Sequence, residues 1–135
     1  MACSQKTVYF EYHSFPLEGW EADSIVSFCF SVPDATKTYD AIISVRHTER
    51  YPYQNMWLFV QNENLSDTIE FYLADNRGRW LGNGFGDKRE MPVLYLQKQH
   101  FGLKDTICIS IRQGMREQLL RGVSEIGLKI VESEQ

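Results

Sequence analysis

The chain has 135 residues, of which 18 are acidic and 14 basic, so its net charge is −4. This length fits one domain, and an apolar share of 43% is enough for the core of a globular protein. The acidic balance, and Lys/Arg runs no longer than a pair, argue against nucleic acid as a partner. No apolar run approaches the roughly 20 residues that a membrane-spanning helix needs.

Short runs of alternating apolar and polar residues, separated by turn formers, predict an all-β chain. We expect strands at residues 7–12, 24–30, 39–47, 55–62, 68–74, 93–97, 106–113 and 125–132. The only helical candidate is MREQLLRGV at 115–123, which could equally be an extended connection. Eight or nine strands without crossover helices favour two antiparallel sheets packed face to face, a β-sandwich of jelly-roll or immunoglobulin-like type.

The same alternation places two of the three cysteines. Cys29 alternates with Phe28, and Cys108 alternates with Ile109, so both cysteines point away from the core. We assign their strands to different sheets of the jelly roll, which puts the two side chains a whole sandwich apart. That distance exceeds the Cα separation of about 7 Å that a disulfide can span. We therefore predict free thiols at Cys29 and Cys108.

The glycine-rich stretch WLGNGFGDKRE, residues 80–90, invites comparison with phosphate-binding loops. The dinucleotide-binding motif needs a third glycine where this chain has Asp87, and it needs a helix directly afterwards. Here a proline and another predicted strand follow, so we reject a phosphate site.

Oxygen donors for calcium are also present nearby, but they do not have the spacing of a twelve-residue EF-hand loop, so a calcium site is not expected. These donors are Asp75, Asn76, Gly78 and Asp87. We expect a tight non-helical crossover in this stretch. Its glycines, Gly82, Gly84 and Gly86, turn the backbone while its apolar side chains pack: Trp80, Leu81 and Phe85.

The sequence contains no recognisable catalytic or metal-binding pattern. The three histidines lie far apart without metal-ligand spacing, and no serine or cysteine nucleophile motif is present. Carboxylate pairs such as Glu18 with Glu21, or Asp87 with Glu90, are typical of solvated loops. A hydrolase would require carboxylates that converge in a pocket. We predict no enzyme activity, no metal and no cofactor.

Aromatic residues provide the most suggestive binding candidates. A β-sandwich normally buries its aromatic side chains in the core, and we expect that role for most of them. If several were exposed together, they would form a platform on which sugar rings stack. The candidate binding surface consists of Tyr51, Tyr53, Trp57, Trp80 and Phe85.

Three segments together resemble the gliding-motility lipoprotein H (GldH) family of Bacteroidetes. They are YPYQNMWLFV at 51–60, the DT-strand with the LGNGF loop at 67–90, and the MR…GV…IG segment at 111–132. SIVSFCFSVPD at 24–34 also matches the family's early strand. The resemblance covers roughly residues 7–132, and the order and spacing of several motifs make it more specific than any one of them.

This resemblance implies a function and gives Cys3 a role. Family members are exported and acylated on a cysteine, and Ala2-Cys3-Ser4 is similar to the end of a lipobox, without the apolar segment of a signal peptide before it. We therefore expect residues 1–6 to be a lipoprotein tether and 7–135 a single β-sandwich domain.

The resemblance also implies a non-enzymatic lipoprotein of the gliding and secretion-associated envelope machinery. It is expected to be membrane-anchored, to face the periplasm and to dock other envelope proteins. The alternative, from a different class, is a carbohydrate-binding module.

Overall fold

The computed structural model describes residues 5–63, 65–102 and 106–134. Eight longer strands are β1 (Thr7–Ser14), β3 (Val26–Phe30), β4 (Tyr39–Thr48), β5 (Asn55–Asn62), β6 (Leu65–Tyr72), β8 (Lys88–Gln99), β9 (Ile107–Gln113) and β11 (Val123–Glu132). Three short ones are β2 (Trp20–Glu21), β7 (Asn83–Phe85) and β10 (Leu119–Leu120). The helical candidate at 115–123 contains β10, and no helix that could cross a membrane occurs among the described residues.

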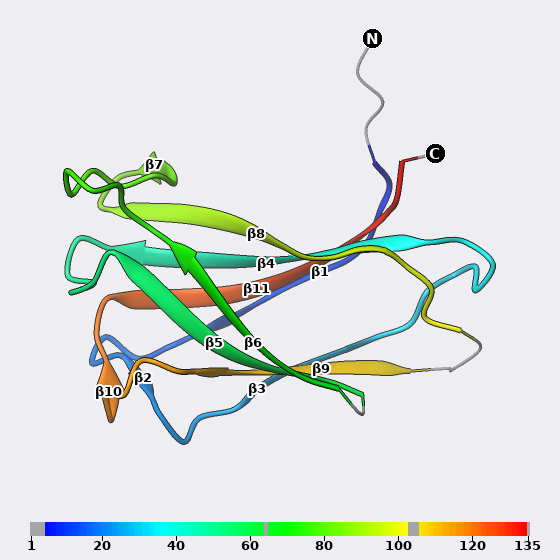
Figure 1. The fold of residues 1–135 in the computed structure, drawn as a ribbon, viewed down its shortest axis with the longest axis horizontal. Coiled ribbons are helices and arrows are strands. Elements are labelled where there is room, and N and C mark those ends of the chain that lie inside the picture. The colour runs from blue at the N-terminus through cyan, green and yellow to red at the C-terminus, as the bar shows by residue number, and fades with distance from the viewer. Residues whose placement is uncertain (1–4, 64, 103–105, 135) are drawn as a thin grey trace, which may run out of the picture.

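Nine of these strands form two facing sheets, a five-stranded sheet in the order β1-β11-β4-β8-β7 and a four-stranded sheet in the order β3-β9-β5-β6 (Figure 1). The short strands β2 and β10 pair with each other in a separate two-stranded sheet. Pairing is antiparallel and nested: β1 with β11, β3 with β9, β4 with β8 and β5 with β6. The chain is thus one long hairpin rolled over two layers, which is the jelly-roll arrangement. The predicted all-β sandwich is confirmed. The strand count is higher than predicted, because the structure adds β2, β7 and β10. These strands are only two or three residues long and were not predicted.

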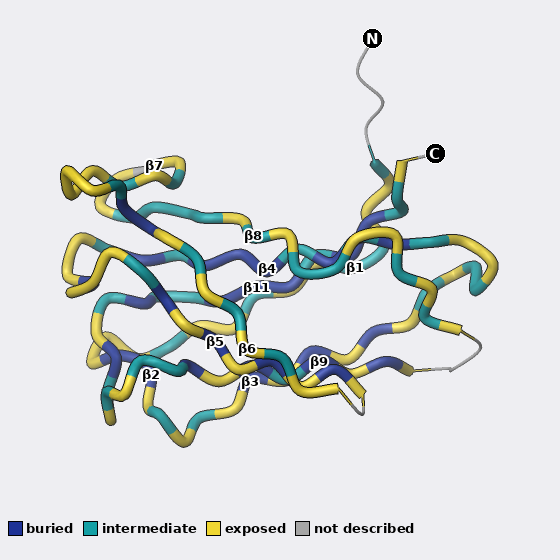
Figure 2. Tube along the Cα trace, in the orientation of Figure 1, coloured by how far each residue is buried: buried dark blue, intermediate teal, exposed yellow. Residues whose placement is uncertain are grey.

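Every second residue of a strand points inward, and these buried residues fill the space between the two sheets (Figure 2). On β4, for example, Ala41, Ile43 and Val45 are fully buried, while Ile42 and Arg46 on the other face are partly exposed. The same pattern holds on β9, where Ile107, Ile109 and Ile111 are buried as predicted. Trp20 of β2 closes one end of this core and is also completely buried.

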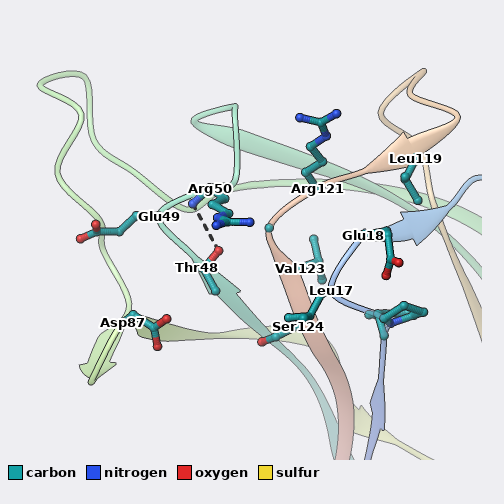
Figure 3. A pocket seen from close by; sticks show the side chains of 13 residues that line it. Leu17, Glu18, Thr48, Glu49, Arg50, Asp87, Leu119, Arg121, Val123 and Ser124 are labelled. Carbon is teal, nitrogen blue, oxygen red and sulfur yellow. Dashed lines mark hydrogen bonds between the residues drawn. The ribbon is translucent and has the colours of Figure 1, made fainter.

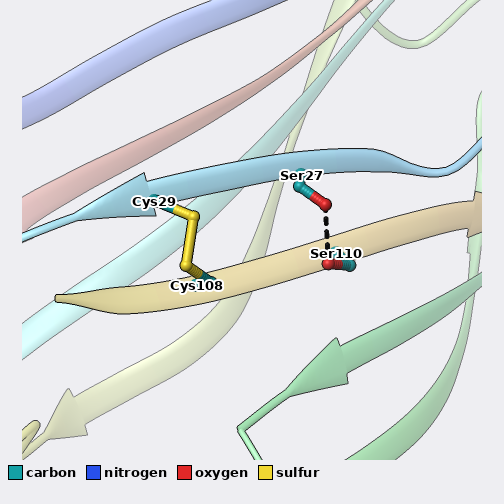
Figure 4. The surroundings of a disulfide bond; sticks show 4 residues. All are labelled: Ser27, Cys29, Cys108 and Ser110. Atoms are coloured by element: carbon teal, nitrogen blue, oxygen red, sulfur yellow. Dashed lines mark hydrogen bonds between the residues drawn. A yellow bond between two sulfur atoms is a disulfide. The ribbon is translucent and has the colours of Figure 1, made fainter.

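The prediction of free thiols is wrong, because Cys29 and Cys108 form a disulfide (Figure 4). Both side chains point outward, as the alternation predicted. The error lies in the connectivity, since β3 and β9 are neighbours in the four-stranded sheet. Cys29 and Cys108 are direct cross-strand partners there, with Cα atoms 4.1 Å apart.

The glycine-rich stretch forms a hairpin rather than the predicted crossover. β7 pairs with the start of β8, and Gly86, at φ +63°, provides the turn. Gly82 allows a close backbone approach, because a Cβ there would lie 2.5 Å from the Glu90 carbonyl oxygen. Trp80 packs against the core, whereas Leu81 is 52% exposed and does not pack as expected. The Phe85 side chain lies outside the described residues.

A charged cluster covers the outer face of the five-stranded sheet. The Tyr12 ring lies over Gly127, where a Cβ would come within 2.7 Å of the ring. The Arg46 guanidinium sits 3.9 Å above the same ring and pairs with Glu90 at 2.6 Å and Glu125 at 3.3 Å. The Tyr12 hydroxyl donates to Glu90 at 2.8 Å. These contacts tie β1, β11, β4 and β8 together on the solvent side.

Candidate docking site at the loop end of the sandwich

Four connections distant in sequence meet at the end of the sandwich opposite the two termini (Figure 1). They follow β1 (residues 15–19) and β4 (49–54), join β7 to β8 (86–87), and join β10 to β11 (121–122). Together they enclose an open depression of about 970 Å³, called the end depression below. Its lining residues are Phe15, Pro16, Leu17, Glu18, Thr48, Glu49, Arg50, Asp87, Leu119, Arg121, Gly122, Val123 and Ser124.

Glycines let the floor of the end depression pack closely. Gly122 has φ +85°, and a Cβ there would lie 2.2 Å from the Tyr51 backbone nitrogen. Gly19 has φ +129°, and its Cβ would lie 2.3 Å from the Leu120 carbonyl oxygen. The Thr48 amide donates to the Gly122 carbonyl at 2.8 Å. Close backbone packing and these hydrogen bonds give the depression a fixed base.

The end depression is lined by charged residues and by one strongly exposed leucine. Leu17, in the connection after β1, is 97% exposed. In residues 5–63, 65–102 and 106–134, no ion pair engages the five charged side chains around it: Glu18, Glu49, Arg50, Asp87 and Arg121. Glu18 and Asp87 lie on opposite sides of the depression (Figure 3). An apolar centre with an unpaired polar rim is the composition of a protein-docking surface.

A buried histidine lies behind the end depression. His47 is fully buried, with its ring 4.7 Å from that of Trp80 and 5.9 Å from that of Tyr51. Nδ1 donates to the Thr48 carbonyl at 3.1 Å, and Nε2 has no hydrogen-bond partner within the described part of the chain. Burial lowers the pKa of His47, because a charged imidazolium would lose its hydration there. This histidine is therefore neutral at pH 7.

The structure gathers three of the five aromatic residues of the predicted binding surface, Tyr51, Tyr53 and Trp80, and places Trp57 apart from them. Tyr51 is buried and Trp80 is half-buried, and both rings pack around His47. Tyr53 stands 6.1 Å from Tyr51, and its hydroxyl donates to Glu117. Trp57 lies apart from them on the outer face of β5. Phe85 stays untested, since its side chain is not described, and Cys3 also lies outside the described residues.

Sequence reasoning missed the residues that form the end depression. Leu17, Arg50 and Arg121 lie in connections that carry no motif, so no local signal separates them from ordinary loop residues. The turn formers of PLEG at 16–19 mark a connection but not its neighbours. Among the described residues, no cluster of three or more His, Cys, Asp or Glu could hold a metal ion.

The fold and the end depression define a jelly-roll β-sandwich domain with a mixed apolar and charged surface at its loop end. Comparison with known proteins gives its family. The chain belongs to the GldH lipoprotein family, whose model matches residues 7–130.

Curated relatives support the family assignment over almost the whole chain. The gliding motility lipoprotein GldH homolog of Christiangramia forsetii is 35% identical over 145 residues, covering 98% of this chain and 88% of the relative. The gliding motility lipoprotein GldH of Flavobacterium johnsoniae is 33% identical over 141 residues, covering 96% and 87%.

A solved structure resembles this fold at low sequence identity. It is a GH115 4-O-methyl-α-glucuronidase, BtGH115A, described as specific for decorated arabinogalactans. The similarity has a TM-score of 0.54 at 13% identity and covers 99% of this chain but 19% of that enzyme. At this identity the likeness shows the fold alone.

Proposed function

We propose that this protein is a non-enzymatic envelope lipoprotein of the gliding-motility and secretion-associated machinery, which acts by docking another envelope protein. Membership of the GldH lipoprotein family and the names of the two relatives support the envelope and motility role. The single observation that carries the docking role is the end depression, with Leu17 97% exposed among charges that no other described residue pairs with.

The proposed anchor is an acylated Cys3, with the sandwich on the periplasmic side of the membrane. Gln5 is fixed at the start of the domain, where its Nε2 donates to Asp40 Oδ2 at 2.9 Å and to the Glu132 carbonyl at 3.2 Å. Two residues of chain span at most about 7 Å, so a lipid on Cys3 would hold this end near the bilayer. The end depression lies at the other end of the sandwich and would face away from the membrane (Figure 1).

The disulfide supports an extracytoplasmic location. Disulfides form and persist in the bacterial periplasm and are rare in the cytosol, where thiols are kept reduced. The Cys29–Cys108 bond lies on the outer face of the sheet, where both cysteines are exposed to solvent. An accessible structural disulfide of this kind is rare in a cytosolic protein.

The placement of the carboxylates supports a non-enzymatic role. A glycosidase needs two carboxyl groups that face one scissile bond. Glu18 and Asp87, which both line the end depression, stand on opposite sides of it (Figure 3). Glu90, three residues after Asp87 on β8, is held by Arg46 and Tyr12 on the outer face of the sheet.

The proposal is tested by affinity capture from envelopes with the acylated protein as bait. We expect specific envelope proteins to be recovered, and Leu17→Asp to reduce their amount by at least about fivefold, the effect of losing 1 kcal/mol at an interface. The matched control is Leu94→Asp on the outer face of β8, where an exposed leucine lies far from the loop end. The proposal fails if no envelope protein is captured, or if both variants capture the same proteins as the unchanged chain.

A further inference from the structure

The outer face of the four-stranded sheet is aromatic and poor in charge. Along β3, β9, β5 and β6, the outward positions carry only two charged residues, Arg112 and Glu70. The exposed apolar residues on or beside this face are Ile25, Trp57, Phe59 and Tyr72. The chain has 32 charged residues, so this face is poor in charge for its size. Aromatic residues with a single arginine are the composition of a binding surface.

A groove of about 400 Å³ crosses three strands of this face. One wall is apolar and aromatic, because Phe59 of β5 is the cross-strand partner of Arg112 of β9, with Ile25 beside them. The opposite wall is polar. It comes from the next row of partners, in which Gln61 stands between Ser110 and Ser66. Thr68 and Asp67 of β6 also line the groove, and the Asp67 carboxylate accepts a hydrogen bond from the Tyr95 hydroxyl. The groove therefore has one wall suited to stacking and one suited to hydrogen bonding.

Arg112 supplies a cation that nothing in the described part of the chain neutralises. Its guanidinium carbon lies 5.2 Å from the centre of the Phe59 ring, and no ion pair engages it among the described residues. Glu70, the other charge on this face, accepts a hydrogen bond from Asn55 Nδ2 at 2.7 Å. A carboxylate is the ligand that a planar guanidinium pairs with best, through two parallel hydrogen bonds.

The polar wall is held in place before any ligand arrives. The Ser27 and Ser110 hydroxyls are hydrogen-bonded at 2.8 Å, and the Ser66 hydroxyl donates to Gln61 Oε1 at 2.6 Å. The Cys29–Cys108 disulfide joins β3 to β9 one row further along (Figure 4). Groups already ordered in this way lose little conformational entropy on binding.

We propose that this groove binds an acidic polysaccharide, a chain of sugar rings that carries uronate carboxylates. The weakly positive C–H face of a sugar ring packs on the negative face of Phe59. Trp57, two residues along the same strand and about 7 Å away, extends the platform to a neighbouring sugar. Arg112 pairs with the carboxylate, and the serine and glutamine wall accepts the sugar hydroxyls. This site is separate from the end depression and adds a second ligand to the proposed docking role.

The position of the groove favours a glycan over an acidic peptide. Extended peptides gain affinity by adding to the open edge of a sheet, through backbone hydrogen bonds. The groove crosses β9 and β5, which are central strands with partners on both sides. Their backbone groups are already paired, so a ligand on this face must bind through side chains. Sugar rings bind in that manner, using their C–H faces and hydroxyls.

The test is isothermal titration calorimetry of the full chain at about 150 mM salt, an ionic strength at which exposed charges are screened beyond roughly 8 Å. The probes are polygalacturonate, the neutral polysaccharide galactomannan, and poly-L-glutamate as a peptide polyanion. We expect polygalacturonate to bind and the other two to bind at least tenfold more weakly. The net charge of −4 disfavours non-specific binding of any polyanion, so saturable binding reports the groove.

The variants use a matched pair of sites on the two sheets. Arg112→Gln and Phe59→Ala are each expected to weaken polygalacturonate binding by about tenfold, the cost of losing one charge-assisted hydrogen bond or one stacking contact. The controls are Lys129→Gln and Phe10→Ala on the other sheet, where the ammonium lies 5.3 Å from the ring centre. Phe10 and Phe59 are 42% and 39% exposed, so the substitutions are comparable. Thermal melts of all four variants check that they remain folded.

Several results would overturn the proposal. It fails if no polysaccharide binds, or if the Lys129 and Phe10 variants lose as much binding as the Arg112 and Phe59 variants. Galactomannan binding as tight as polygalacturonate binding contradicts the uronate contact at Arg112. Equal binding of poly-L-glutamate identifies the groove as a peptide site instead. None of these results affects docking at the end depression, which Leu17→Asp tests separately.

Discussion

Replacing Cys29 and Cys108 with serine should cost this domain a large part of its stability. The bond closes a loop with a sequence separation of 79 residues. The chain-entropy relation for a loop of that length gives about 4.5 kcal/mol at 25 °C. Measured effects usually fall below this limit, so we expect a loss of about 3–4 kcal/mol. Because domains of this kind are stable by about 5–15 kcal/mol, the variant should still fold.

The assay is equilibrium urea unfolding of the unchanged chain and the double serine variant, followed by tryptophan fluorescence. The unchanged chain with its disulfide reduced should unfold at the same urea concentration as the variant. The matched control is the neighbouring cross-strand pair Ser27 and Ser110, replaced by alanine. This change removes one hydrogen bond and should cost about 1 kcal/mol. A serine variant within about 1 kcal/mol of the unchanged chain would contradict the reasoning, since the loop entropy would then contribute nothing.

Three further predictions concern the buried histidine, one glycine and the charged cluster. Stability should fall as pH drops below 6.5, by up to about 1.4 kcal/mol per pH unit. The reason is that the pKa of His47 is lowered in the folded chain, so the unfolded chain binds the proton more strongly. Urea unfolding between pH 7.5 and 5.5 checks this slope, and His47→Gln should flatten it. Gly122→Ala should destabilise the domain more than Gly78→Ala, measured by thermal unfolding. Both glycines have φ near +80°, which costs an alanine about 1–2 kcal/mol, but only Gly122 also meets backbone. An equal loss at the two glycines would disprove the clash. Burial and the Glu90 carboxylate raise the pKa of Tyr12 to about 12, so Glu90→Gln should lower it in an ultraviolet pH titration; an unchanged pKa would mean that the hydrogen bond does not form.

Alternation in the sequence was enough to predict the sandwich and the inward faces of β3 and β9. Each of the eight predicted strands overlaps a long strand of the structure, and the inward isoleucines of β9 were placed correctly. The strands β2, β7 and β10 are too short for any periodicity to register. Local pattern thus predicts elements well when they span several side-chain repeats.

Connectivity was the step that local pattern could not supply. In a long hairpin rolled over two sheets, early strands pair with late ones in nested order. Tyr9 pairs with Ile130, Cys29 with Cys108 and Ile42 with Leu94. Nested pairing of this kind follows from the jelly roll once that fold is accepted. Applied to the sequence, it would have placed the two cysteines side by side.

The exposed aromatic face was hidden from sequence reasoning for a different reason. In NMWLFVQN both faces of β5 are apolar, with Met56 and Leu58 on one and Trp57 and Phe59 on the other. Alternation separates the two sets but cannot say which set faces the core. The end depression was equally hidden, because its four connections meet only through the topology of the whole chain.

Docking at the end depression can be observed by site-specific photo-crosslinking in intact cells. A photo-reactive amino acid replaces Leu17 in one strain and Leu94 in another, since both leucines are exposed and lie on different parts of the sandwich. We expect a discrete crosslinked band from position 17, containing an envelope protein, and none from position 94. Crosslinking at position 94 alone, or at neither position, would contradict it.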